Sequence, residues 1–266
     1  MRSLIFTLML VLVPAFAPAQ SFGMTDAEAI NVSGRQRMLS QRMMKSYLMV
    51  GAQIKADIAQ RQLDESVALF ESQFIELRDY APSDEVNAKL DQVEVIWLTH
   101  REKILARPGK GDAPPLMQEN LILLNACNEV VKEIEAYSGI ESGKLVNMSG
   151  RQRMLSQKIA KAYVAIAWNV SAPNLEEEFA AAIQLFDESL SDLEASDMNT
   201  EELKLALIKV RNQWRFSQSG FRLGDDDRYV PTVITVTTDS ILRKMNDITG
   251  QYAKVMESAQ MMASDE

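Results

Sequence analysis

Nine consecutive residues, Ser-Gly-Arg-Gln-Arg-Met-Leu-Ser-Gln, occur twice in this chain, at 33–41 and again at 149–157. The same spacing relates Asn31 with Asn147, Lys45 with Lys161, Tyr47 with Tyr163, and Pro115 with Pro231. Landmarks spread over a whole segment indicate a duplicated domain rather than a copied peptide. The sequence therefore predicts two copies of one folding unit, 20–138 and 139–266.

Apolar residues in each copy recur at the three- and four-residue spacing of amphipathic helices. Residues Thr25 to Glu28 match a capping box, which predicts the start of the first helix. Pro115 and Pro231 suit the first turn of a fourth helix in each copy. The expected fold is all-α, with about eight helices in two tandem antiparallel four-helix bundles. Because 137–146 contains no proline, the two copies could be joined by a continuous helix.

One segment favours a different structure by composition alone. Residues 230–238 are almost all β-branched, which is typical of a β-strand. The repeat, however, places this segment opposite 116–124, and a single strand would have no partner. We therefore expect a helix, with a paired strand as the alternative.

The first 19 residues have the pattern of an export signal. Arg2 precedes an apolar run, 4–16, and the small residues Ala17-Pro-Ala19 follow it. The run is shorter than the roughly 20 residues that span a bilayer as a helix. We expect a cleaved signal peptide, 1–19, and a periplasmic protein; an uncleaved membrane anchor is the alternative. The net charge of −9 disfavours nucleic acid and anionic membranes as partners.

The two motif segments are basic and contain no acidic residue within an otherwise acidic chain. Planar guanidinium groups can donate to two oxygens of a planar oxyanion at once, so an anion is the natural ligand. Glycine inside a helix costs about 1 kcal/mol relative to alanine, and Gly34 and Gly150 therefore predict close approach of a helix or ligand. The basic residues are Arg35, Arg37, Arg42 and Lys45 in the first copy and Arg151, Arg153, Lys158 and Lys161 in the second.

The stretch 31–42, Asn-Val-Ser-Gly-Arg-Gln-Arg-Met-Leu-Ser-Gln-Arg, resembles the N-terminal helix of the PilJ-type, NarX-like sensor domain. This domain occurs in type IV pilus chemotaxis transducers and in nitrate/nitrite sensor kinases. Both copies fit the family pattern Asn-x-x-Gly-x-x-Arg-Met-x-Ser-x-Arg, except that Lys158 replaces the last arginine. About a dozen residues in each copy carry the resemblance.

The resemblance implies a periplasmic four-helix bundle whose motif helices face each other across a dimer and hold one nitrate between two arginines. These arginines correspond to Arg37 and Arg153. Asn31, Asn147, Gly34, Gly150, Arg42 and Lys158 complete the expected ligand-binding set. The residues after each glycine, Arg35-Gln36 and Arg151-Gln152, are closer to the pilus type, which need not bind nitrate. The two copies could form the site within one chain or between the chains of a homodimer.

Three functions are compatible with these patterns. The first is a non-enzymatic sensory module that binds a small oxyanion, nitrate or nitrite, and signals through a membrane-bound partner. The second is a helical scaffold or adaptor that contacts a membrane receptor or a pilus component without a small ligand. An enzyme is the weakest, because His100 has no evident catalytic partner and the sequence carries no metal or nucleophile motif. No cofactor is expected.

Overall fold

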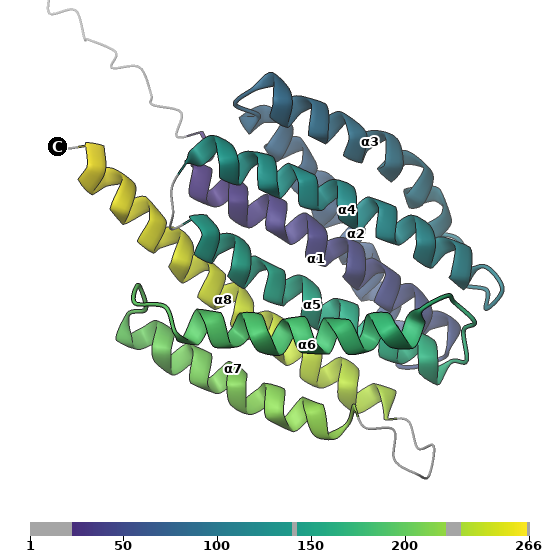
Figure 1. The fold of residues 1–266 in the computed structure, drawn as a ribbon. Coiled ribbons are helices and arrows are strands. Elements are labelled where there is room, and N and C mark those ends of the chain that lie inside the picture. Colours follow the sequence, from purple (N-terminus) through teal and green to yellow (C-terminus); the bar gives the residue numbers. More distant parts are fainter. Residues whose placement is uncertain (1–22, 140–142, 222–229, 265–266) are drawn as a thin grey trace, which may run out of the picture.

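The computed structural model describes residues 23–139, 143–221 and 230–264, which form eight α-helices and no strand (Figure 1). The expected all-α fold is confirmed. The predicted signal peptide, 1–19, lies outside the described residues. The helices are α1 (Asp26–Gly51), α2 (Ala56–Tyr80), α3 (Asp84–Ile104), α4 (Ala113–Ser138), α5 (Gly143–Ala167), α6 (Leu175–Glu194), α7 (Glu201–Ser219) and α8 (Pro231–Ser264).

Local sequence signals set several helix ends. Thr25 caps α1 with both bonds of a capping box, its hydroxyl oxygen accepting from the backbone N–H of Glu28. Helix α8 starts at Pro231, so the segment that follows is helical and the strand alternative is wrong. Gly139 adopts a left-handed φ of 64° and ends α4. The continuous helix considered across the junction is therefore not formed.

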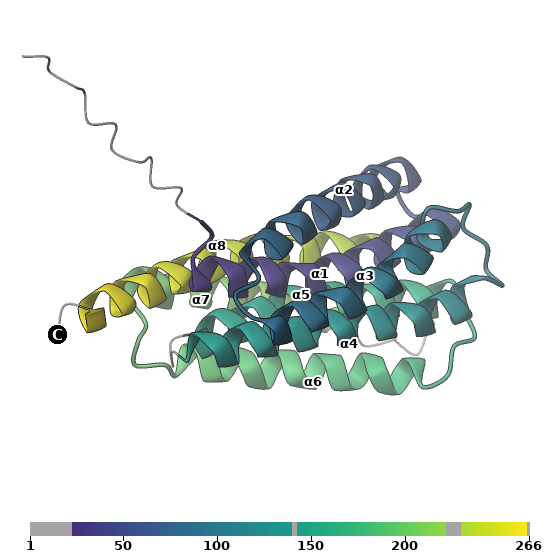
Figure 2. The ribbon, with the colours of Figure 1, turned by 90° about the horizontal axis from the view of Figure 1, so that it is seen from above.

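The motif helices α1 and α5 lie side by side at the centre of the molecule (Figures 1 and 2). Helix α1 packs against α2 and α4, and α5 packs against α6 and α8. Each motif helix thus contacts its own bundle on one side and the other motif helix on the other. The two copies pair within one chain.

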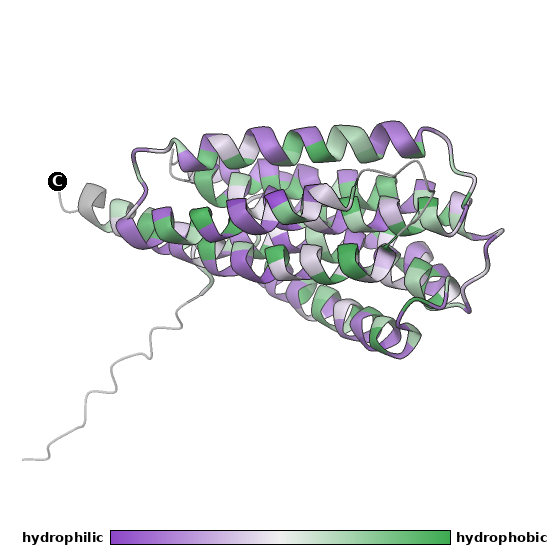
Figure 3. Cartoon of the chain, turned by 90° about the horizontal axis from the view of Figure 1, so that it is seen from below, coloured by the Kyte–Doolittle hydropathy of each residue, from purple (hydrophilic) through white to green (hydrophobic). Residues whose placement is uncertain are grey.

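The two copies have the same aromatic packing in their interiors. Phe70 stacks on Trp97 with ring centroids 4.3 Å apart, and Phe186 stacks on Trp214 at 4.1 Å, both at an interplanar angle of 32°. Hydrophilic and hydrophobic residues are interspersed along the helices, as in amphipathic helices (Figure 3). The motif helices are different, because polar and charged side chains of α1 and α5 are buried with the apolar ones.

Candidate anion-binding site

Arg37 on α1 and Arg153 on α5 are almost completely buried between the motif helices, at 1% and 0% exposure. Both guanidinium groups lie beside the motif glycines. A Cβ atom on Gly34 would stand 3.3 Å from Nη2 of each arginine, and one on Gly150 would stand 3.1 Å from Arg153 Nη2 and 3.6 Å from Arg37 Nη2. The two glycines therefore provide the space in which the guanidinium groups converge.

Amide oxygens hold the Arg37 guanidinium. Its Nη1 donates to Asn128 Oδ1 on α4 at 2.9 Å, and its Nη2 donates to Asn147 Oδ1 on α5 at 2.7 Å. The amide nitrogen of Asn147 donates in turn to Glu135, which orients its oxygen toward the arginine. Arg37 is thus tied both to its own bundle and to the other copy.

Arg153 follows the same plan with one difference. Its Nη1 donates to Asn246 Oδ1 on α8 at 3.1 Å, but its Nη2 donates to the backbone oxygen of Asn31, at 3.0 Å, rather than to the side chain. The Asn31 Oδ1 atom is buried, as is the Nε atom of each arginine, and none of these atoms has a hydrogen-bond partner within the described ranges. Polar capacity therefore remains unused around the pair.

Neither arginine forms an ion pair within the part of the chain that the structure describes. Burial, together with the charge of Arg151, lowers the pKa of Arg37 to about 10. Burial also lowers the pKa of Arg153, and the charges of Arg35 and Arg37 act in the same direction. Two buried cations whose direct hydrogen-bond partners are neutral amide and backbone oxygens form a region of positive potential, which Glu135 offsets in part at Arg37 and which suits an anion.

A second polar layer lies further along the motif helices. Lys45 on α1 pairs with Asp239 on α8 at 2.6 Å, and Asp239 also accepts from Gln62 at 3.1 Å and from Gln157 at 3.2 Å. Arg42 lies close enough to contribute to lowering the pKa of Asp239. This layer joins the first copy to the second.

The structure brings together six of the eight residues expected at the site, the paired arginines, glycines and asparagines of the motif. It does not bring Arg42 and Lys158 to the pair. Arg42 belongs to the Asp239 layer, and Lys158 lies 3.9 Å from Glu178. The sequence reasoning missed Asn128 and Asn246, for which the only signal is an asparagine inside an amphipathic fourth helix.

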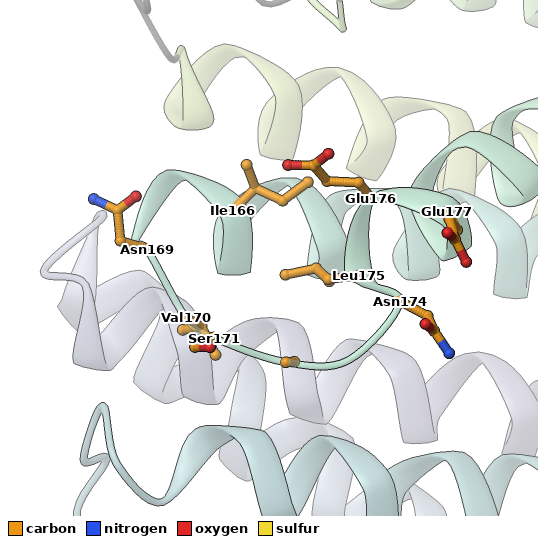
Figure 4. Close-up of a pocket in the computed structure, with 9 residues that line it drawn as sticks. Ile166, Asn169, Val170, Ser171, Asn174, Leu175, Glu176 and Glu177 are labelled. Carbon is orange, nitrogen blue, oxygen red and sulfur yellow. The ribbon is translucent and has the colours of Figure 1, made fainter.

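Two cavities lined by described residues lie away from the arginines. One of about 420 Å³ lies at the α5–α6 loop, where Leu175 points into the arc of the loop while Asn169 and Glu177 point outward (Figure 4). Among the described residues, no group of three or more His, Cys, Asp or Glu side chains could hold a metal ion. No helix in the described ranges is long and apolar enough to cross a membrane.

Comparison with known proteins gives one result. The family model described as "Type IV pili methyl-accepting chemotaxis transducer N-term" (PilJ) matches residues 23–122 and 141–219, one segment in each copy. Neither the curated proteins nor the solved structures give a match. The match covers more than half of the chain and includes both motif helices, so the chain belongs to the PilJ family of chemotaxis-transducer sensory domains.

Proposed function

We propose that this chain is a periplasmic, non-enzymatic sensory module whose paired arginines bind one small oxyanion, with nitrate or nitrite as the first candidates. The observation that carries the proposal is the convergence of Arg37 and Arg153 beside two glycines. Both arginines are buried, and neither forms an ion pair with a described carboxylate. The tandem copies would supply within one chain the two motif helices that the resemblance places in two subunits.

The electrostatics favour an anion over an empty site. Two unit charges about 5 Å apart repel by about 3 kcal/mol at an effective dielectric constant near 20. A planar anion between the guanidinium groups would replace this repulsion by charge-assisted hydrogen bonds. The unpartnered Nε atoms are donors for such an anion, and the Asn147 amide could turn away to release Nη2 of Arg37.

The binding step would become a signal through the packing of α1 on α5. Each arginine reaches across to an asparagine of the other copy, so a ligand that changes these contacts would change how the motif helices pack. The family places such modules in a transducer context, and a membrane-bound signalling protein is the expected recipient.

Calorimetric titration and thermal shift tests with nitrate, nitrite, chloride and sulfate test the proposal. Ligand at about 100 times Kd should stabilise the fold by about 2.7 kcal/mol. Arg37→Lys and Arg153→Lys keep the charge but lose the planar donor geometry, and should each weaken binding by at least about tenfold. Arg61→Ala, at an exposed position on α2, is the control and should bind as the wild type does.

One observation favours the scaffold or adaptor function. All four Nη atoms of the arginine pair already donate to asparagine oxygens, as expected of residues that only join helices. In that case no anion would raise the melting temperature, and Arg37→Lys would lower it in buffer alone. The same two measurements therefore separate the two functions.

A further inference from the structure

A second cavity of about 420 Å³ lies at the end of the first bundle, where α3 and α4 are connected. Tyr47 and Leu116 contribute its aromatic and aliphatic walls. Tyr47 follows Arg37 by ten residues on α1, which corresponds to about 15 Å along a helix. The cavity is therefore separate from the arginine pair, and its volume is within the range of small-molecule sites.

The cavity wall carries two bases and two acids. Lys103 pairs with Glu119 at 2.5 Å through one carboxylate oxygen. The other oxygen, Oε2, is buried and has no hydrogen-bond partner in the part of the chain that the structure describes. The side chains of Arg107 and Asp112 form no ion pair or hydrogen bond with any described residue. Opposite charges thus line one cavity, and two of them remain available to a ligand.

His100 adds a further unsatisfied polar group behind this wall. It is 1% exposed, and neither ring nitrogen has a hydrogen-bond partner among the described residues. Burial lowers its pKa to about 4, and the charged groups that act on it are Glu119 and Lys103, both from the cavity wall. Buried polar atoms are normally hydrogen-bonded, so the described residues leave polar capacity unused at this end of the bundle.

We propose that this cavity binds a free amino acid through both of its charged groups. The ligand carboxylate would pair with Arg107, whose planar fork matches it. The ligand ammonium would lie beside the Asp112 carboxylate, and its aliphatic part would lie against Leu116. The balanced charge of the wall favours a zwitterion over an ion of either sign.

A thermal-shift screen of the common L-amino acids, followed by calorimetry of the best one, tests the proposal. Its N-acetyl and amide derivatives, which each lack one charge, should bind at least about tenfold more weakly. Arg107→Gln and Asp112→Asn should weaken binding of the free amino acid to a similar extent. Lys110→Gln, on the same loop but outside the cavity wall, is the matched control and should bind normally.

Two results would overturn the proposal. One is that no amino acid shifts the melting temperature; the other is that the blocked derivatives or the Arg107 and Asp112 variants bind as well as their parents. Nitrate titration of the same variants keeps the two sites distinct. The affinity for nitrate should be unchanged by Arg107→Gln, whether or not an amino acid binds.

Discussion

The Lys45 ammonium on α1 forms an ion pair with the Asp239 carboxylate on α8, with 2.6 Å between Nζ and Oδ1. The pair connects the first copy to the second at a place where Lys45 is fully buried and the Asp239 side chain is 15% exposed. Among the described residues, the repeat-related Lys161 has no ion pair of this kind. Asn120 on α4 accepts from Gln41, as Asp239 accepts from Gln157, so an amide stands where the other copy has the carboxylate. The duplicated bundles are therefore not equivalent in this layer.

Replacing Asp239 by asparagine should destabilise the protein by about 3 kcal/mol, because it leaves a buried ammonium group without its counter-charge. The double variant Lys45→Met/Asp239→Leu should recover much of this loss, since it removes both charges. Urea unfolding followed by circular dichroism measures the free energies. If the single variant is as stable as the wild type, the pair does not hold the copies together.

Gly51 lies against Trp168 of the second copy, and this contact predicts a specific sensitivity. A Cβ atom on Gly51 would stand 2.3 Å from Cη2 of the Trp168 ring. Gly51→Ala should therefore lower stability by about 1 to 3 kcal/mol, as overpacking does. Gly250→Ala on α8 is the control, since its Cβ would have nothing within 4 Å, and it should raise stability by up to about 1 kcal/mol.

A second substitution separates the clash from other effects at Gly51. Trp168→Leu should rescue the Gly51→Ala variant, because the smaller side chain leaves space for the methyl group. Melting temperatures of the two single variants and the double variant give the coupling between them. Additive effects would show that the ring and the glycine do not constrain each other.

Helix positions and the central role of the motif followed from the sequence because their causes are local. The capping box at Thr25 fixes the start of α1, and the duplicated charges and glycines mark α1 and α5 as a pair. The β-branched run after Val230 is the exception, because the repeat rather than its local composition predicts a helix. Its burial in a helix, with Ile234 and Thr238 at 0% exposure, overrides the strand propensity of its residues.

The contacts between copies did not follow from the sequence, because they depend on how the fourth helices align. Asn128 and Asn246 have the same role, yet they are separated by two residues more than the motif spacing. The different roles of Asn120 and Asp239 likewise cannot be predicted from the sequence, because they depend on which glutamine each residue contacts. The choice of pairing within one chain required the packing of α1 on α5.

Gly34→Ala and Gly150→Ala probe the proposed anion site without removing a charge. The added Cβ would stand 3.3 Å and 3.1 Å, respectively, from the nearest guanidinium nitrogens and would force them to shift by a few tenths of an ångström. Both variants should weaken nitrate binding by about tenfold, since planar recognition is sensitive to such shifts. Their melting temperatures should change little, because the helical gain of alanine offsets the crowding.

Lys161 should make the stability of the protein depend on alkaline pH. It is buried, and burial, assisted by the charge of Lys158, lowers its pKa to about 8 from 10.5. Between pH 8 and pH 10.5 the unfolded chain therefore holds a proton on this amine that the folded protein has released. Because the unfolded state binds more protons, stability should rise with pH in this window and stay level, as far as this group is concerned, outside it.

The measurement compares the wild type with Lys161→Met, so that titration of the other groups cancels. The difference in the free energy of unfolding, wild type minus variant, should increase by up to about 3 kcal/mol as the pH rises from 8 to 10.5. Lys254→Met, which removes one exposed charge, is the control for a general effect of net charge. A difference between wild type and Lys161→Met that is the same at every pH would mean that the buried amine keeps one protonation state throughout. Its burial would then be compensated by a group such as Glu178, which acts to raise the pKa of this lysine.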